Sequence, residues 1–242
     1  MSATCRIDTL ITRSVVGIDF GSTGIRVVLI PIGEPNKFHP VQYRNCGPGL
    51  VIGDFPASCC PFRPDRLDYV GDKAINMPDS QSIKYLMYHL GNIPDENYPL
   101  SQKLRERKND PLFTTIAISI IETCFRRIKD HTELLCMGLQ LEYQEIALSV
   151  PGQWVQEMLD LYAEIISRVF HHVSVDQIHW ANESEALLHF ILHHHGYKLV
   201  RQPQPFSDVT NVEYLDILLV IDFGGHSTVI SPKCPNLGWA ID

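Results

Sequence analysis

Two apolar runs rich in β-branched residues begin the chain, at residues 14–20 and 25–30, and a short stretch of small residues separates them. Apolar runs joined by Gly, Ser and Thr are typical of a β-hairpin, so we expect residues 14–30 to form one. Residues 36–60 predict further short extended segments, because Gly and Pro interrupt them repeatedly. Residues 69–74 predict the end of a strand followed by a turn.

Helical periodicity begins further along the chain. A short helix is expected around residues 82–90, within a surface segment at 76–110 that is rich in Pro, Asn and charged residues. A longer helix is predicted from about Pro111 to Lys129, since Pro suits the first helical position. Its apolar residues recur every four positions and predict a core-facing stripe. The stripe consists of Leu112, Ile116, Ile120, Cys124 and Ile128.

Two more helices are expected after the turn at Pro151 and Gly152. The first has a broad apolar face. Its members are Trp154, Val155, Met158, Leu159, Tyr162, Ile165, Ile166 and Val169. The second is predicted at residues 183–195, with apolar residues inward. These are Ala186, Leu187, Phe190 and Ile191.

Alternating apolar residues predict a strand at 142–150. Further strands are expected at 173–180 and at 217–222, the latter with a hairpin partner at 227–231. Early strands followed by alternating helices and strands predict an α/β fold with a mixed β-sheet and flanking helices. A polar stretch with two prolines, at 203–210, is the best candidate for a domain boundary.

Composition narrows the class of protein. The 242 residues are 45% hydrophobic and 20% charged, which is ordinary for a globular protein. The net charge of −8 argues against nucleic acid as a partner. No apolar stretch approaches the roughly 18–20 residues of a membrane span. Seven cysteines without a Cys-x-x-Cys pair predict reduced thiols and a cytoplasmic location, with a mitochondrial presequence as the alternative.

One repeated motif contains residues suited to ligand binding. Ile-Asp-Phe-Gly occurs at residues 18–21 and again at 221–224, each time after an apolar run. Glycine lets backbone N–H groups approach a phosphate, and successive N–H groups in a tight turn form a concavity that binds anions. An aspartate repels phosphate but can hold Mg²⁺ through water. Two such loops would clamp a polyphosphate from both sides. The alternative is that both are ordinary hairpins with glycine turns.

Five motifs in order resemble those of the nucleotide-binding domain of 70-kDa heat-shock proteins, within the actin-like ATPase superfamily. They are Gly-Ile-Asp-Phe-Gly-Ser-Thr at 17–23, Val-Gly-Asp-Lys-Ala at 70–74, Ala-Leu-Ser-Val-Pro-Gly-Gln-Trp at 147–154, Trp-Ala-Asn-Glu-Ser-Glu-Ala at 180–186 and Leu-Val-Ile-Asp-Phe-Gly-Gly at 219–225. They resemble the divergent fungal-type relatives more than the chaperones themselves. The resemblance implies an actin-like ATPase (ribonuclease H-like) fold.

The resemblance also implies a domain organisation. Residues 1–13 would be an N-terminal extension, 14–202 lobe I, 203–212 a linker and 213–242 the start of lobe II. In the family, lobe II supplies the adenosine pocket and closes the cleft, so we expect this chain to be a truncated form of the domain.

ATP and Mg²⁺ are the ligands that the resemblance implies. Asp19 and Asp222 would coordinate the hydrated Mg²⁺ and serve catalysis together with Glu183, which would orient the ion or the attacking water. Pro151 would lie at a hinge that responds to the nucleotide. Other residues would line the phosphates. These are Gly21, Ser22, Thr23, Gly224, Gly225 and Ser227.

Two departures from the family predict weak or lost ATP hydrolysis. Ile75 stands where the chaperones carry a catalytic lysine, and Lys73 nearby is expected to point elsewhere. His226 adds a side chain where the second loop requires a close backbone approach. A co-chaperone or other protein is the expected partner.

Two other functions stay open. A small-molecule (sugar-type) kinase shares the Asp-x-Gly-Ser/Thr-Thr type of loop, and a non-catalytic half-domain or gene-model remnant would fit a missing lobe. His189 and His193, one helical turn apart, suggest a metal site only weakly, because histidine is also favoured near the C-terminus of a helix.

Overall fold

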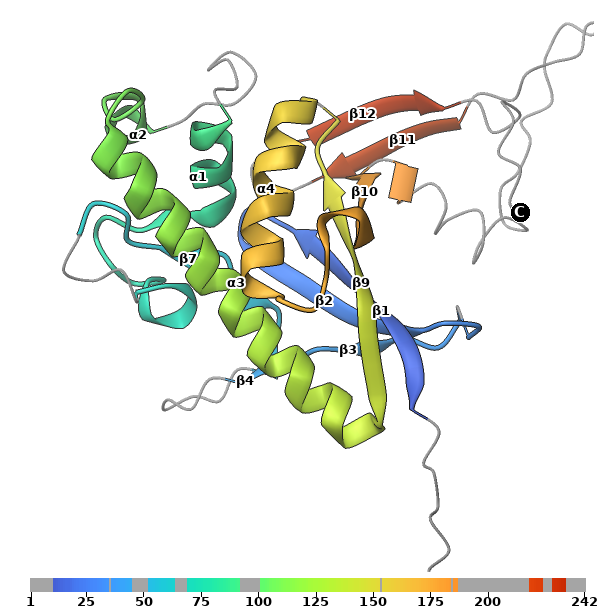
Figure 1. Cartoon of the computed structure of the whole chain (residues 1–242). Coiled ribbons are helices and arrows are strands. Elements are labelled where there is room, and N and C mark those ends of the chain that lie inside the picture. The colour runs from blue at the N-terminus through green and yellow to red at the C-terminus, as the bar shows by residue number, and fades with distance from the viewer. Residues whose placement is uncertain are drawn as a thin grey trace, which may run out of the picture. The chain divides into compact units, whose positions relative to one another are not determined.

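The computed structural model describes residues 11–34, 36–44, 52–63, 69–91, 101–152, 154–183, 185–186, 218–223 and 228–233. The chain divides into two compact units, 1–180 and 181–242, and each is described by itself. A mixed β-sheet with flanking helices forms most of the first unit (Figure 1). The prediction of an α/β fold with a mixed sheet is confirmed at this level.

The main sheet has the strand order β10-β9-β1-β2-β3, and β6 also pairs with β2. Its strands are β1 (Thr12–Phe20), β2 (Gly24–Pro31), β3 (His39–Pro40), β6 (Phe55–Pro56), β9 (Leu141–Val150) and β10 (Ile178–Asn182). β1 pairs antiparallel with β2 and parallel with β9. The hairpin expected at 14–30 and the strand expected at 142–150 are therefore confirmed.

Short strands lie between β3 and the first helix, and those within 36–60 agree with the Gly- and Pro-interrupted pattern, whereas the strand at 81–82 was not predicted. They are β4 (Tyr43–Arg44), β5 (Ile52–Gly53), β7 (Ser58–Cys59) and β8 (Gln81–Ser82). Val70 bridges to Cys59, and a 3₁₀ turn, η2 (Gly71–Lys73), follows directly. The expected strand end and turn at 69–74 are thus confirmed.

The described residues of this unit form the helices α1 (Ile83–Leu90), α2 (Gln102–Arg105), α3 (Pro111–Leu139) and α4 (Gln156–Val169). Alternate residues of β1 are buried, so one face of the strand belongs to the core, where the Phe20 ring lies 5.4 Å from the Phe125 ring of α3. None of the helices in the described ranges is both long enough and apolar enough to cross a membrane.

Helix α3 is longer than its sequence pattern predicts. The expected end near Lys129 is wrong, because Thr132 and Cys136 continue the buried four-residue stripe. The helix ends at Leu139, and the C-cap residue Gln140 has a φ of 56°. The inward position expected for Leu112 is also wrong: the residue is 70% exposed, and Phe113 is buried instead. A stripe of every fourth residue drifts around a helix of 3.6 residues per turn, so its first member lies off the buried face.

Two boundaries around α4 also differ from prediction. Val155, assigned to the apolar face, is half exposed at the N-cap position of the helix. The strand expected at 173–180 begins only at Ile178, because a 3₁₀ turn, η3 (Val175–Gln177), precedes it. The side chains of Ser174 and Gln177 form a capping box that stabilises this turn.

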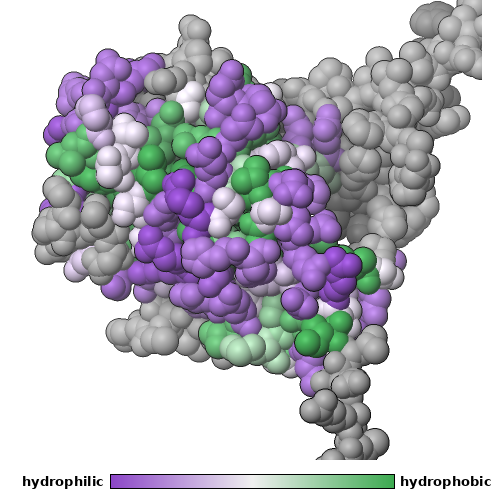
Figure 2. All heavy atoms as spheres, viewed as in Figure 1, coloured by the Kyte–Doolittle hydropathy of each residue, from purple (hydrophilic) through white to green (hydrophobic). Residues whose placement is uncertain are grey.

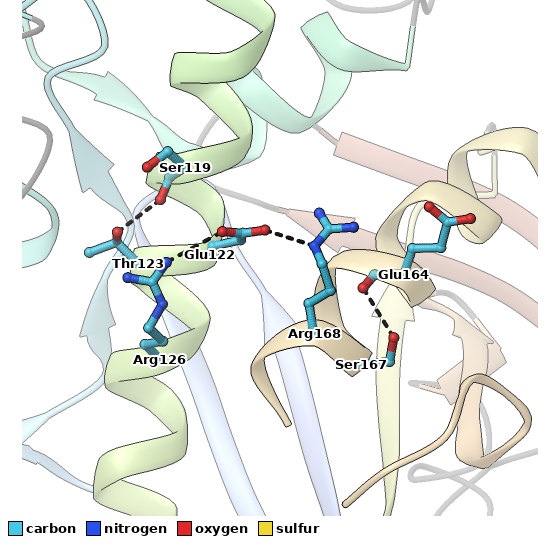
Figure 3. Close-up of polar contacts among 7 residues, drawn as sticks. All are labelled: Ser119, Glu122, Thr123, Arg126, Glu164, Ser167 and Arg168. Carbon is cyan, nitrogen blue, oxygen red and sulfur yellow. Dashed lines mark hydrogen bonds and ion pairs between the residues drawn. The ribbon is translucent and has the colours of Figure 1, made fainter. Parts of the chain in front are cut away.

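Helices α3 and α4 are joined at the surface by Glu122, which pairs with Arg126 at 3.3 Å and with Arg168 at 3.0 Å (Figure 3). Exposed pairs of this kind stabilise a fold by at most about 1 kcal/mol. Apolar contacts, such as that between the rings of Phe125 and Phe170, therefore dominate this packing. On the face shown in Figure 2, hydrophobic residues form separate patches among hydrophilic ones.

The second unit contains an antiparallel hairpin of β11 (Leu218–Phe223) and β12 (Thr228–Lys233). The hairpin expected at 217–231 is confirmed, but the expected strand end at 231 is wrong. Pro232 lies within β12, opposite Leu219. Proline is tolerated there because both strands of a two-stranded sheet are edge strands. Most of the helix predicted at 183–195 and the linker predicted at 203–212 lie outside the described residues, and residues 183, 185 and 186 are helical.

Candidate functional site

Asp19 and Ser149 lie side by side at the carboxyl ends of two parallel strands, β1 and β9. The hydroxyl of Ser149 donates a hydrogen bond of 2.8 Å to Oδ1 of Asp19. In open α/β sheets, ligands bind outside the carboxyl ends of the strands. Asp19 and Ser149 both lie at that end of their strands.

The alternation along β1 explains the orientation of Asp19. Val16, Ile18 and Phe20 point into the core, so Asp19 lies on the opposite face of the strand. Its carboxylate side chain remains 44% exposed. The predicted site residue is therefore accessible at the end of a strand whose position the core determines.

The loop between β1 and β2, Gly21 to Thr23, is attached to the rest of the unit through its carbonyl groups. Ser82 donates its hydroxyl to the Ser22 carbonyl at 2.7 Å, and the Ala57 N–H donates to the Thr23 carbonyl at 3.3 Å. No residue in the described part of the chain accepts a hydrogen bond from the N–H of Ser22 or Thr23. Among the described residues, these two backbone donors are therefore not engaged, and donors of this kind can bind anions.

Gly21 is required by close packing within this loop. A Cβ atom at this position would lie 2.5 Å from the carbonyl oxygen of Gly24, a separation that real Cβ atoms essentially never show. The φ of Gly21 is not positive, so the requirement is one of space and not of backbone conformation. This requirement lies within the loop itself and is separate from the predicted approach of its backbone to a phosphate.

Arg26 and Asp54 are site residues that the sequence analysis missed. Arg26 lies directly across the hairpin from Asp19. Its NH1 atom is 3.2 Å from Oδ2 of Asp19, and its Nε atom is 3.1 Å from Oδ2 of Asp54. A signal for Arg26 was present, because it is the only charged residue in the apolar run at 25–30. Asp54 has no comparable signal.

The other expected site residues fall elsewhere. Glu183 starts a helical turn directly after β10, in the second unit, and is half-buried. Asp222 pairs with Val229 in the hairpin of that unit. Residues 224–227, which include Gly224, Gly225 and Ser227, lie outside the described residues. Pro151 follows β9 directly and is buried. Within the first unit, the structure brings together Asp19 and the loop from Gly21 to Thr23.

The residues around Asp19 fit a hydrated magnesium ion better than a metal bound by protein alone. Within the described ranges, no three His, Cys, Asp or Glu residues are grouped as a set of metal ligands. Mg²⁺ usually keeps several waters and takes one or two carboxylates plus the phosphates of its substrate. Asp19 is a partly exposed carboxylate at the end of its strand, so it suits an ion of this type.

The most strongly perturbed ionisable groups of the core are structural. Burial raises the pKa of the Cys124 thiol to about 12 and raises that of the Tyr162 hydroxyl well above its ordinary value. A thiol that stays protonated is not a nucleophile. These residues are therefore poor candidates for covalent catalysis.

Comparison with known proteins gives no further evidence about the family or the function of the chain. No protein-family model matches the chain, and no curated protein sequence is significantly similar to it. The candidate site therefore rests on the geometry of these residues.

Proposed function

We propose that the chain binds ATP with Mg²⁺ at the Gly21–Thr23 loop and resembles the nucleotide-binding domain of 70-kDa heat-shock proteins. One observation carries the proposal. A loop that keeps two backbone N–H donors follows a partly exposed aspartate at the carboxyl edge of a sheet. The donors would hold phosphate oxygens, and Asp19 would hold Mg²⁺ through water.

The architecture supports this proposal. A hairpin, intervening helices and a strand parallel to β1 are compatible with the actin-like ATPase fold that the motifs imply. Asp222, Gly224, Gly225 and Ser227 would complete the clamp from the second hairpin, and Glu183 would orient water. Their assignment to the same site is part of the proposal.

Hydrolysis is proposed to be weak or lost. Ile75, at the position of the family's lysine, is 50% exposed and has no charge. The ammonium of Lys73 lies 5.9 Å from the centroid of the Tyr69 ring. Phosphoryl transfer depends on positioning and on neutralising charge, and bound Mg²⁺ would supply part of that neutralisation. Without the lysine, the site is better suited to binding than to turnover.

The cysteines support a reducing compartment such as the cytoplasm. Cys59, Cys124 and Cys136 are buried cysteines outside any disulfide. Disulfides are rare in the cytosol, where thiols are kept reduced. Buried thiols are compatible with that environment.

Calorimetric titration with Mg·ATP tests the proposal on the whole chain. The wild type is expected to bind, and Asp19→Ala is expected to weaken binding at least about tenfold, since a charge-assisted contact is worth about 1.5–3 kcal/mol. Asp160→Ala, which removes an exposed aspartate on α4, serves as the matched control and should bind like the wild type. No binding by the wild type would refute the proposal.

A further inference from the structure

We infer that Arg26 is a ligand-binding residue of this loop, whose guanidinium contacts the phosphate chain of the nucleotide. The inference rests on the proposed function, which it extends to a residue outside the expected motif. It begins from the ion pairs around Asp19.

Arg26 is held at the loop by carboxylates from two different parts of the unit. Asp19 comes from β1, while Asp54 lies between β5 and β6. One carboxylate contacts NH1 and the other contacts Nε, so both ends of the guanidinium are positioned. Gly24 permits this arrangement, because a Cβ atom there would lie 3.2 Å from Cβ of Asp54.

The guanidinium remains available to a ligand. The Arg26 side chain is 68% exposed even with both ion pairs formed. A guanidinium carries five N–H donors in a planar fork that matches phosphate geometry, and the two contacts to Asp19 and Asp54 leave donors for a third partner. A lysine, with a single ammonium, could not bridge the same groups in this way.

The charges explain why such a residue is needed. Asp19 and Asp54 place two negative charges beside a loop that is proposed to bind polyphosphate. Arg26 offsets one of them, and the Mg²⁺ that accompanies the nucleotide would offset more. Removal of Arg26 would leave both carboxylates facing the phosphates and should weaken binding.

Calorimetry with Mg·ATP and with magnesium tripolyphosphate compares the wild-type chain with Arg26→Gln, Arg26→Lys and Arg13→Gln. Arg26→Gln is expected to weaken binding of both ligands about 10- to 100-fold, the loss typical of a contact to a charged group. Arg26→Lys should recover part of the affinity. Arg13, an exposed arginine near the other end of β1, is the matched control and should stay within about twofold of the wild type.

Thermal unfolding of each variant confirms that the compared proteins are folded, and exposed ion pairs contribute little to that transition. Unchanged affinity in Arg26→Gln would overturn the inference while leaving ATP binding in place. Tighter binding would overturn it too, because Arg26 would then be a competitor of Mg²⁺ for Asp19. A wild-type chain that binds neither ligand contradicts the proposed function itself.

Discussion

Substitution of Gly21 by alanine tests whether the candidate site depends on close packing within its own loop. The new Cβ would lie 2.5 Å from the carbonyl oxygen of Gly24, and this obstacle is backbone, which cannot rotate away as a flexible side chain can. The loop must therefore open. Opening displaces the Ser22 and Thr23 carbonyls from Ser82 and Ala57.

The expected cost follows from these contacts. Overpacking of this kind destabilises a protein by about 1–3 kcal/mol. We expect the lower half of that range, because the loop is only partly buried. The Ser22 and Thr23 donors would also move, so the affinity for Mg·ATP should fall at least about tenfold.

Urea unfolding monitored by circular dichroism, with calorimetry on the same samples, measures both effects. Gly53→Ala is the matched control, since nothing lies within 4 Å of the position of its new Cβ and its φ is not positive. It should be neutral or slightly stabilising. The packing argument fails if Gly21→Ala unfolds at the same urea concentration as Gly53→Ala and binds Mg·ATP like the wild type.

Three further predictions concern the framework of the first unit. Tyr162→Phe removes a buried hydroxyl that donates to the Met87 carbonyl at 2.6 Å, and urea unfolding should show a loss of about 1 kcal/mol; an unchanged free energy would mean that this bond is not stabilising. Hydrogen bonding from the Phe113 N–H, together with Arg107, lowers the pKa of Asp110, the N-cap residue of α3. The ionised carboxylate therefore stabilises the fold above pH 3.8, and this contribution is lost as the pH falls through the lower pKa of the folded state. Asp110→Ala should accordingly lower the melting temperature at pH 7 but change it less at pH 2, and equal effects at both pH values would contradict the assignment. Because burial raises the pKa of Cys124 to about 12, iodoacetamide at pH 8 should label its peptide only after unfolding, as mass spectrometry can determine; rapid labelling of the native chain would show that the thiol is accessible.

The β-hairpins and β9 could be predicted from sequence because their signal is local. The hairpin strands are short apolar runs separated by small residues, and β9 alternates apolar and polar residues over a few positions. The length of α3 could not be predicted in the same way. Thr132 and Cys136, which continue its buried stripe, are poor indicators of a helix, and their burial depends on what packs against them.

The candidate site likewise combines residues that a local motif predicts with residues that only long-range strand pairing brings near. Asp19 and its loop could be predicted from a motif of a few residues. Arg26 could have been predicted as the residue of the second strand that pairs with Asp19 in the hairpin. Asp54 and Ser149 could not be found this way. Their positions depend on the pairing of β6 with β2 and of β9 with β1, which join segments far apart in the sequence.

The conformation of the loop from Gly21 to Thr23 therefore depends on the folded unit and not on the hairpin motif alone. Its carbonyl groups are held by Ser82 and by the amide of Ala57, which lie far from Asp19 in the sequence. These two hydrogen bonds engage the carbonyl groups of Ser22 and Thr23, while no described residue accepts a hydrogen bond from the N–H groups of the same two residues. A glycine-rich turn without such partners could orient its peptide groups in many ways. The capacity to bind a phosphate chain should therefore depend as much on Ala57 and Ser82 as on the glycines that first indicate it.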